Sequence, residues 1–241
     1  KTETAMRVRS RLERILAYAT THGYRSGDNP ARLKGHLDTI LSPGHKLKKT
    51  NHYPALPHSS ANRYLSELRL IPTASARALE FTILTAARSG DTRGATWNEI
   101  NFKNKTWTIP ASRIKAGKEH IVPLSSASMC ILTAVPEGDG SELIFKGNSG
   151  VLSDMTLGKI IKSLHKKDLH NGGSFLDPVN NRIATTHGFR STFRDWAAEE
   201  TSFSREVIEH CLAHQLKDKT EAAYQRSTTL KKRTKLMQKW C

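Results

Sequence analysis

The chain has 241 residues, 37% of them hydrophobic and 25% charged, so it can bury a sizeable core and is neither disordered nor fibrous. Its 38 Lys and Arg residues against 22 Asp and Glu residues leave a net charge of +16, which favours nucleic acid as a partner over an inert basic surface. No stretch approaches the roughly 20 apolar residues that span a bilayer, and no signal peptide is recognisable, so we expect a soluble cytoplasmic protein without a membrane partner.

The N-terminal part of the chain predicts a small helical unit. Apolar side chains recur at helical spacing along Thr2–His22 and predict a helix with one buried face, formed by Val8, Leu12, Ile15, Leu16 and Ala19. A short helix is expected over Pro30–His36 because Pro30 suits a first helical turn. The following Pro- and Lys-rich stretch predicts a linker over residues 46–57, so residues 1–45 form the C-terminal part of a helical domain.

Residues 58–241 predict one domain that is mainly α-helical with a small antiparallel three-stranded sheet, an α+β fold. Alternating β-formers between turn residues indicate strands at Thr96–Ile100, Thr106–Ile109 and His120–Leu124. Lys166–Asn181, rich in Gly and Asn, indicates a loop. Helical periodicity predicts the helices Ser59–Leu68, Thr73–Ala87, Ser125–Ala134, Ser153–Leu164, Thr185–Glu199, Ser204–Leu212, Lys217–Arg226 and Thr229–Trp240.

Signatures of metal and cofactor sites are missing from the sequence. The 3 cysteines, Cys130, Cys211 and Cys241, stand outside any CxxC spacing, which argues against a zinc site and a disulfide framework. The 11 histidines form no HExxH motif, and no carboxylate cluster suits Mg²⁺. Neither a GxxxxGK[ST] loop nor a GxGxxG after a strand is present. We therefore expect an enzyme without metal or cofactor, or a binding protein.

Two segments place cations where they can meet a phosphate. In TAARSGD, Arg88 ends an apolar helix and Asp91 follows three residues later, where its carboxylate can orient the guanidinium. In IKAGKEH, a Gly-containing turn lifts Lys115 on the tip of a hairpin. Each observation also has an ordinary structural reading, since a positive side chain is common at a helix end and a hairpin lysine is commonly solvated.

Two further segments contain histidine, arginine and tyrosine at defined spacings. In THGFR, His187 and Arg190 are three residues apart at a helix start and project from one face. CLAH is followed by EAAYQR, which places Tyr224 ten residues after His214 on a short helix. A tyrosine in the core is the structural alternative for Tyr224.

The order Arg, Lys, His-x-x-Arg, His and Tyr resembles that of the tyrosine recombinase (phage integrase) family. The blocks TAARSGD, IKAGKEHIVPLS, THGFRSTFRDWAAE and CLAHQLKDKTEAAYQR are similar to those of its satellite-phage and genomic-island integrase subgroup. The resemblance implies that residues 58–241 are the catalytic domain and that residues 1–45 are the C-terminal part of the core-binding domain. The family's arm-binding domain and the start of the core-binding domain have no counterpart in the sequence. Ala213 departs from the family's usual Gly before the last histidine.

The resemblance implies a catalytic set of Tyr224, Arg88, Arg190, His187, Lys115 and His214, with Asp91 in support. Arg88 and Arg190 would neutralise the phosphate, and Tyr224 would form a 3′-phosphotyrosyl intermediate. His187 would accept the phenol proton, and Lys115 would protonate the departing 5′-oxygen. His214 would hydrogen-bond a phosphate oxygen.

Some assignments leave alternatives open. Lys118 lies on the same turn as Lys115 and can be the acid instead. Arg113, Lys118 and His120 flank that turn and are expected DNA contacts. The C-terminal helix can pack on its own core or on a neighbouring protomer, and the resemblance favours the neighbour.

The function implied is that of a site-specific DNA recombinase that integrates or excises a mobile element without cofactors. Its expected partners are double-stranded DNA attachment sites, further copies in a tetramer on DNA, and accessory proteins that bend DNA, all at the bacterial nucleoid. A nicking-closing enzyme like the type IB topoisomerases and a catalytically inactive DNA-binding fragment are the alternatives.

Overall fold

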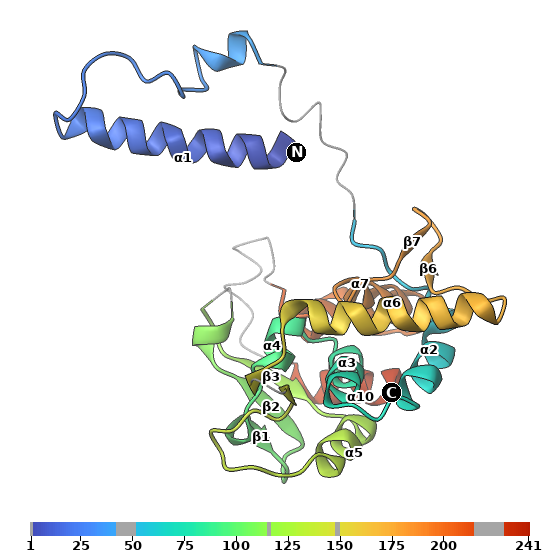
Figure 1. The fold of residues 1–241 in the computed structure, drawn as a ribbon. Helices are drawn as coiled ribbons and strands as arrows, with labels where there is room; N and C mark the ends of the chain where they lie inside the picture. The colour runs from blue at the N-terminus through green and yellow to red at the C-terminus, as the bar shows by residue number, and fades with distance from the viewer. Residues whose placement is uncertain (1, 42–51, 115–116, 148–149, 215–228) are drawn as a thin grey trace. The chain divides into compact units, whose positions relative to one another are not determined.

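The computed structural model describes residues 2–41, 52–114, 117–147, 150–214 and 229–241. The chain forms two compact units, Lys1–His52 and Tyr53–Cys241, and each is described by itself (Figure 1). The break between them falls inside the interval 46–57, of which residues 46–51 lie outside the described part. The assignment of the two units to domains of the family stays a prediction.

The first unit consists of helix α1 (Thr2–Thr21) and an extended loop with one 3-10 turn, η1 (Leu37–Thr39). The predicted helix at Thr2–His22 is confirmed, but the one at Pro30–His36 is wrong. Side chains take over the backbone hydrogen bonds there, since Asn29 Oδ1 accepts from Ala31 N at 3.0 Å. Asp38 likewise accepts from the backbone of two residues in this loop, which favours turns over a helix.

The predicted buried face of α1 is only partly covered, with Leu16 and Ala19 half-buried and the rest exposed. Val8, Leu12 and Ile15 are 49%, 48% and 62% exposed, and Ala31 is the one buried hydrophobic residue among those described in this unit. The loop after α1 is too short to cover a helix face of this length, because burying it takes a second packed layer. The apolar periodicity therefore predicted the helix correctly and overestimated how far its face is buried.

The second unit contains most of the helices. Its α-helices are α2 (Ala61–Arg69), α3 (Ala74–Thr85), α4 (Ser89–Arg93), α5 (Ser126–Ala134), α6 (Asp154–His170), α7 (Gly188–Glu199), α8 (Arg205–Cys211) and α10 (Leu230–Trp240). Its 3-10 helices are η2 (His58–Ser60), η3 (Trp97–Glu99) and η4 (Ala111–Arg113). The predicted helices are confirmed within a few residues, except that Lys217–Arg226 lies outside the described residues. None of the described helices is long and apolar enough to cross a membrane.

Helix α6 runs six residues beyond its predicted end, into the predicted loop Lys166–Asn181. Its last turns are held by tertiary contacts: buried His165 accepts a hydrogen bond from Phe175 N at 3.1 Å, and buried Asp168 pairs with Arg63. The rest of that loop contains the antiparallel hairpin β6 (Leu176–Asp177) and β7 (Arg182–Ile183). Two-residue strands carry too little alternation to be predicted.

The three-stranded antiparallel sheet is confirmed, in the order β1 (Ile100–Asn101), β2 (Thr106–Ile109) and β3 (His120–Pro123). The first strand is shorter than predicted because Trp97 N and Asn98 N donate to Glu142 O and Gly140 O, which draws this segment away from β2. A further small hairpin pairs β4 (Lys146–Gly147) with β5 (Gly150–Val151). The expected class, mainly α with a small antiparallel sheet, is confirmed.

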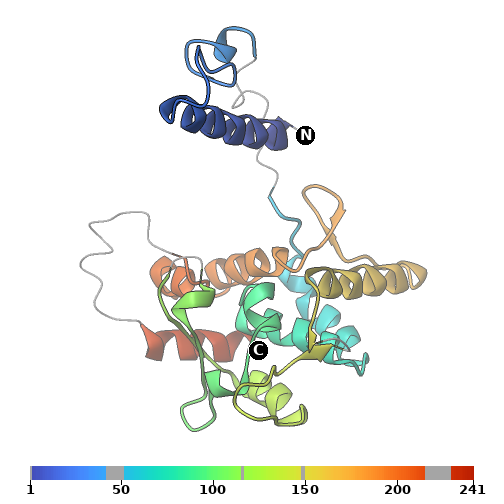
Figure 2. The same cartoon turned by 60° about the vertical axis from the view of Figure 1, so that its left-hand side comes forward.

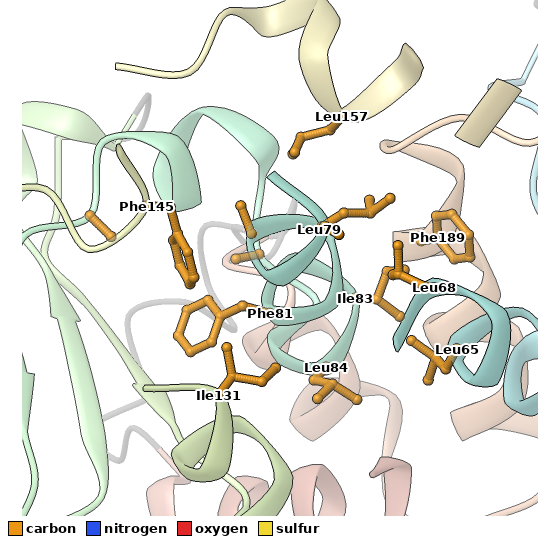
Figure 3. Packing of buried hydrophobic residues seen from close by; sticks show 14 of the residues in the cluster. Leu65, Leu68, Leu79, Phe81, Ile83, Leu84, Ile131, Phe145, Leu157 and Phe189 are labelled. Carbon is orange, nitrogen blue, oxygen red and sulfur yellow. The ribbon is translucent and has the colours of Figure 1, made fainter. Parts of the chain in front are cut away.

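Helix α3 forms the centre of the second unit, with the sheet and α5 on one side and α2 and α7 on the other (Figures 1 and 2). Phe81 points toward Phe145 and Ile131, whereas Leu79 and Ile83 point toward α2 and α7 (Figure 3). The Phe81 and Phe145 rings lie 5.5 Å apart. Burial on every side fixes the C-terminal end of α3, and the first residues of the candidate site follow directly after it.

The C-terminal helix α10 packs on its own unit. Leu236 and Met237 are buried, and Trp240 Nε1 donates to Ile83 O of α3 at 2.9 Å. The Trp240 ring also lies 5.5 Å from Phe193 and 5.0 Å from Trp196. Of the two alternatives for this helix, the structure of the single chain has the one on its own core. Docking on a neighbouring protomer in an assembly stays a prediction.

Candidate active site

Two helix ends and one helix start meet around the side chain of Arg190. Ala86 follows the last residue of α3, and Ala213 comes two residues after the last residue of α8; both alanines have the left-handed backbone conformation with φ of 50°. Helix α7 begins at Gly188, so its first turn carries Arg190. Carbonyl groups at the ends of α3 and α8 thereby point at one side chain from α7.

Arg190 is buried and its cation is held by these carbonyls. Its Nη1 donates to Ala86 O at 2.5 Å, and its Nη2 donates to Leu212 O at 2.5 Å. Carbonyls at a helix C-terminus carry partial negative charge, which stabilises a cation there. Burial, and secondly the charge of Arg88, lower the pKa of Arg190 to about 10, so the group stays charged at neutral pH. Its Nε is buried without a hydrogen-bond partner among the described residues, which leaves a donor for an anion.

Arg88 lies beside Arg190 at the start of α4. Its Nη2 donates to Ala213 O at 3.4 Å, and its Nη1 lies 3.9 Å from Asp91 Oδ2. Asp91 is buried, and this burial raises the pKa of its carboxyl, an effect that the positive charge of Arg88 opposes. The spacing of TAARSGD therefore placed Arg88 and Asp91 together as expected, and the supporting role of Asp91 stays a prediction.

His187 is the residue before α7 and is exposed. Partial desolvation of the ring, followed by the charges of Arg190 and Arg88, lowers the pKa of His187. An imidazole that is neutral at pH 7 can accept a proton. The Tyr53 ring lies against it, with centroids 4.5 Å apart, a contact that no sequence signal indicated.

The backbone before η2 fixes the start of α7. Thr185 N donates to Pro54 O at 3.0 Å, and Thr185 Oγ1 accepts from Gly188 N at 3.0 Å. A Cβ atom on Gly188 would overlap Pro54 O, so only glycine allows this close approach. The helix start that carries His187 and Arg190 is therefore locked to the segment at Pro54.

His214 follows the left-handed Ala213 at the end of α8. His214 N donates to Glu209 O at 3.0 Å and Ala213 N donates to His210 O at 3.2 Å, the hydrogen-bond pair of a Schellman motif. The reversal brings the side chains of Glu209 and His214 together, with Oε2 and Nδ1 2.5 Å apart. His214 Nε2 lies 3.2 Å from Arg190 Nη2. Glu209 was missed in the sequence because five residues separate it from His214 across a helix end.

The three expected DNA contacts have different environments. Lys118 is exposed. Arg113 donates to Glu99 Oε2 at 2.7 Å, and the same oxygen accepts from Trp107 Nε1 at 2.8 Å. His120 is half-buried at the start of β3, and burial, with the charges of Arg233 and Arg88, lowers its pKa to about 4. Lys118 is therefore the best placed of the three to reach DNA, and contact with DNA stays a prediction for all of them.

The structure thus brings together Arg88, Arg190, His187 and His214, with Asp91 beneath them. Tyr224 and Lys115 lie outside the described residues. Among the residues that are described, no group of three or more His, Cys, Asp or Glu side chains could hold a metal ion. The cluster presents two guanidinium groups and two imidazoles at one place, and this combination suits a phosphate diester.

The sequence is similar to known proteins over its whole length. Residues 55–231 match the phage integrase family, and residues 1–36 match the phage integrase central domain. The integrase of Enterobacteria phage P4 is 28% identical over 258 residues, covering 100% of this chain and 54% of the relative. Prophage integrase IntA of Escherichia coli K12 is 28% identical over 240 residues, covering 99% of this chain and 54% of the relative. The chain thus spans about half the length of these relatives.

Solved structures share its fold. A lambda integrase tetramer bound to a Holliday junction superposes with a TM-score of 0.62 at 19% identity, covering 91% of this chain and 60% of that one. The Tn1549 transposon integrase in complex with circular intermediate DNA also gives a TM-score of 0.62, at 16% identity, covering 98% of this chain and 79% of that one. With the family match over residues 55–231, these findings show that the chain belongs to the phage integrase family of tyrosine recombinases.

Proposed function

We propose that the chain acts in site-specific DNA recombination, cleaving and rejoining strands through a 3′-phosphotyrosyl intermediate to integrate or excise a mobile element. The observation that carries the proposal is the pair Arg88 and Arg190, held by helix-end carbonyls beside His187 and His214. Family membership supports the reaction class, and the relatives named above are integrases by name.

In the proposed cleavage step, the Tyr224 oxygen attacks the scissile phosphorus and the bond from phosphorus to the 5′-oxygen breaks. His187 takes the phenol proton, and Lys115 gives a proton to the departing oxygen. Arg88 and Arg190 neutralise the charge that develops on the phosphate, with His214 as a further donor. The phosphotyrosyl bond conserves the energy of the broken bond, so a 5′-hydroxyl of another strand can reverse the step without ATP.

The charge of +16 supports duplex DNA attachment sites as the substrate. Two structural neighbours, a lambda integrase tetramer on a Holliday junction and a transposon integrase on DNA, support assembly on DNA. We propose a tetramer assisted by DNA-bending proteins at the bacterial nucleoid. We assign residues 1–45 to the C-terminal part of the core-binding domain, 46–57 to the linker and 58–241 to the catalytic domain.

Isolation of DNA fragments that become covalently linked to the protein tests the reaction on a mixture of all candidate target sequences. The chain is incubated with sheared DNA of the organism that encodes it, in EDTA, and protein-linked fragments are isolated under denaturing conditions and sequenced. We expect one enriched sequence with wild-type protein and none with Tyr224→Phe, because the variant lacks the nucleophile. DNA affinity of the variant, measured in parallel, should be nearly unchanged.

Other outcomes separate the alternatives. Capture of fragments without sequence preference, together with relaxation of supercoiled plasmid, would indicate a nicking-closing enzyme instead. DNA binding with no captured fragment would indicate an inactive DNA-binding fragment. Fragments captured equally well by Tyr224→Phe would contradict the proposed nucleophile.

A further inference from the structure

The side chain of His214 is held between two partners of opposite charge. Arg190 lies on its Nε2 side at 3.2 Å and Glu209 on its Nδ1 side at 2.5 Å. We propose that Glu209 is a positioning residue for strand cleavage, which holds His214 so that its Nε2 faces Arg190 and the phosphate, and which stabilises the protonated imidazole. This inference rests on the proposed function.

Glu209 itself is fixed in place. Its side chain is 13% exposed, and its second oxygen, Oε1, accepts from Arg194 Nε at 2.8 Å. These contacts, to His214 and Arg194, keep its pKa low against the opposing effect of burial. The Schellman turn at Ala213 brings the backbone of His214 to the same residue, since His214 N donates to Glu209 O. Backbone and side chain of His214 are thus both bound to one glutamate.

The direction of the two hydrogen bonds defines which ring nitrogen of His214 carries a proton. A guanidinium can only donate, so the contact of Arg190 Nη2 with Nε2 of His214 is a hydrogen bond in the tautomer whose Nε2 carries a lone pair. The proton of the neutral ring is then on Nδ1, and it is donated to Glu209. Without a phosphate, His214 is therefore an acceptor toward the site, the opposite of what a phosphate oxygen needs.

A bound phosphate changes this arrangement. When a phosphate oxygen accepts the hydrogen bond that Arg190 had donated to His214, the lone pair on Nε2 of His214 faces an anion. Uptake of one proton from solvent at Nε2 converts the ring into a donor, and no covalent bond changes. The carboxylate of Glu209 stabilises the resulting imidazolium through a charge-assisted hydrogen bond.

The other charged groups around His214 act against protonation. Arg190 comes from the first turn of α7, Arg88 donates to the neighbouring carbonyl of Ala213, and the charge of His214 is in turn felt by His187. Arg194 is also a cation, although it reaches His214 only through Glu209. Of the described side chains that hydrogen-bond to the ring, Arg190 and Glu209, only Glu209 is an anion. Loss of its charge should therefore make protonation of His214 harder.

Single-turnover cleavage of a suicide duplex carrying the captured sequence tests the proposal, measured from about pH 6 to about pH 9, where histidines titrate. We expect Glu209→Gln to slow cleavage about tenfold at the alkaline end, the rate equivalent of one charge-assisted hydrogen bond. The defect should shrink toward the acidic end, where solvent protons replace the effect of the carboxylate. Glu209→Asp, which keeps the charge, should restore part of the alkaline rate.

Matched variants separate this role from a structural one. Glu200→Gln removes the same charge from an exposed position at the end of α7 and should leave the rate profile unchanged. Because Glu209 acts through His214, adding Glu209→Gln to His214→Ala should cost nothing further. A defect of equal size at every pH, or an additional loss in the double variant, would overturn the proposal. Absence of cleavage by the wild-type chain would instead count against the proposed function.

Discussion

The two histidines of the candidate site, His187 and His214, have neighbours of opposite charge. Partial burial and the cations Arg190 and Arg88 disfavour the protonated form of His187, whereas the ring of His214 contacts the carboxylate of Glu209. The proposed cleavage reaction needs one base and one donor, and this difference supports His187 as the base and His214 as the donor. The residue types alone do not distinguish them.

The environment of His187 predicts the acidic limb of the pH–rate profile. Its pKa is lowered from the ordinary value of 6.5, so the ring stays neutral, and able to accept a proton, at a lower pH than an ordinary histidine. We therefore expect the rate of cleavage to fall only below about pH 6.5. Measured single-turnover rates should show this limb in wild type and not in His187→Gln. An acidic limb centred above that pH would contradict the role of His187 as the base.

At the scale of elements, the site depends on how helices end. Ala213 and Ala86 both adopt a left-handed conformation that favours glycine, and the carbonyl of each accepts a hydrogen bond from an arginine of the candidate site. The departure of Ala213 from the glycine that is usual in the family therefore has a cost in stability, because its Cβ is crowded in that conformation.

Replacing Ala213 by glycine should stabilise the second unit. We expect the free energy of unfolding to rise by about 0.5–1 kcal/mol, because relief of the left-handed strain outweighs the added freedom of the unfolded chain. Urea unfolding measures the change. Ala198→Gly, at an exposed position inside α7, is the matched control and should destabilise by about 1 kcal/mol. A lower free energy of unfolding for Ala213→Gly would contradict the claim that the left-handed conformation of Ala213 is strained.

Elements with long apolar periodicity could be predicted from the sequence, and short ones could not. Helix α3 was predicted within two residues at each end because Ala76, Leu79 and Ile83 recur at helical spacing, although burial continues around the whole helix. The hairpin of β6 and β7 was missed because two-residue strands have no pattern. Exposure of the apolar face of α1 depends on what packs against it, which local sequence does not encode.

The residues of the candidate site also divide into those that the sequence indicated and those that it did not. Arg88, Arg190, His187 and His214 were found because their order resembles that of a family and their chemistry suits phosphate. Glu209 and Tyr53 were missed because turns in the backbone, and not sequence spacing, bring them to the histidines. The structure brings the first four together, but the catalytic roles of all six residues, Tyr224 and Lys115 included, stay predictions.

At the scale of the whole molecule, positive charge is spread over both units. Residues 1–52 contain 11 Lys and Arg residues against 4 Asp and Glu residues, so they contribute +7 of the total charge. On α1, Arg11 and Arg14 are exposed. We expect the first unit to contact DNA phosphates through such residues, and contacts of this kind make binding sensitive to salt.

A double variant, Arg11→Gln with Arg14→Gln, tests this contribution in the full chain. Each lost phosphate contact should reduce the slope of log affinity against log salt concentration by about 0.9, so the pair should reduce it by about 1.8. Fluorescence anisotropy with a labelled duplex at several salt concentrations measures the slope. An unchanged slope would show that α1 does not contribute through these arginines.

The most direct test of the central claim is to map the attachment site in the protein–DNA adduct. The adduct formed in EDTA is digested with nuclease and trypsin, and the modified peptide is sequenced by mass spectrometry. We expect a nucleotide linked through its 3′-phosphate to Tyr224 in the peptide Thr220–Arg226. Attachment to any other residue, or through a 5′-phosphate, would contradict strand cleavage by Tyr224 at the site formed by Arg88, Arg190, His187 and His214.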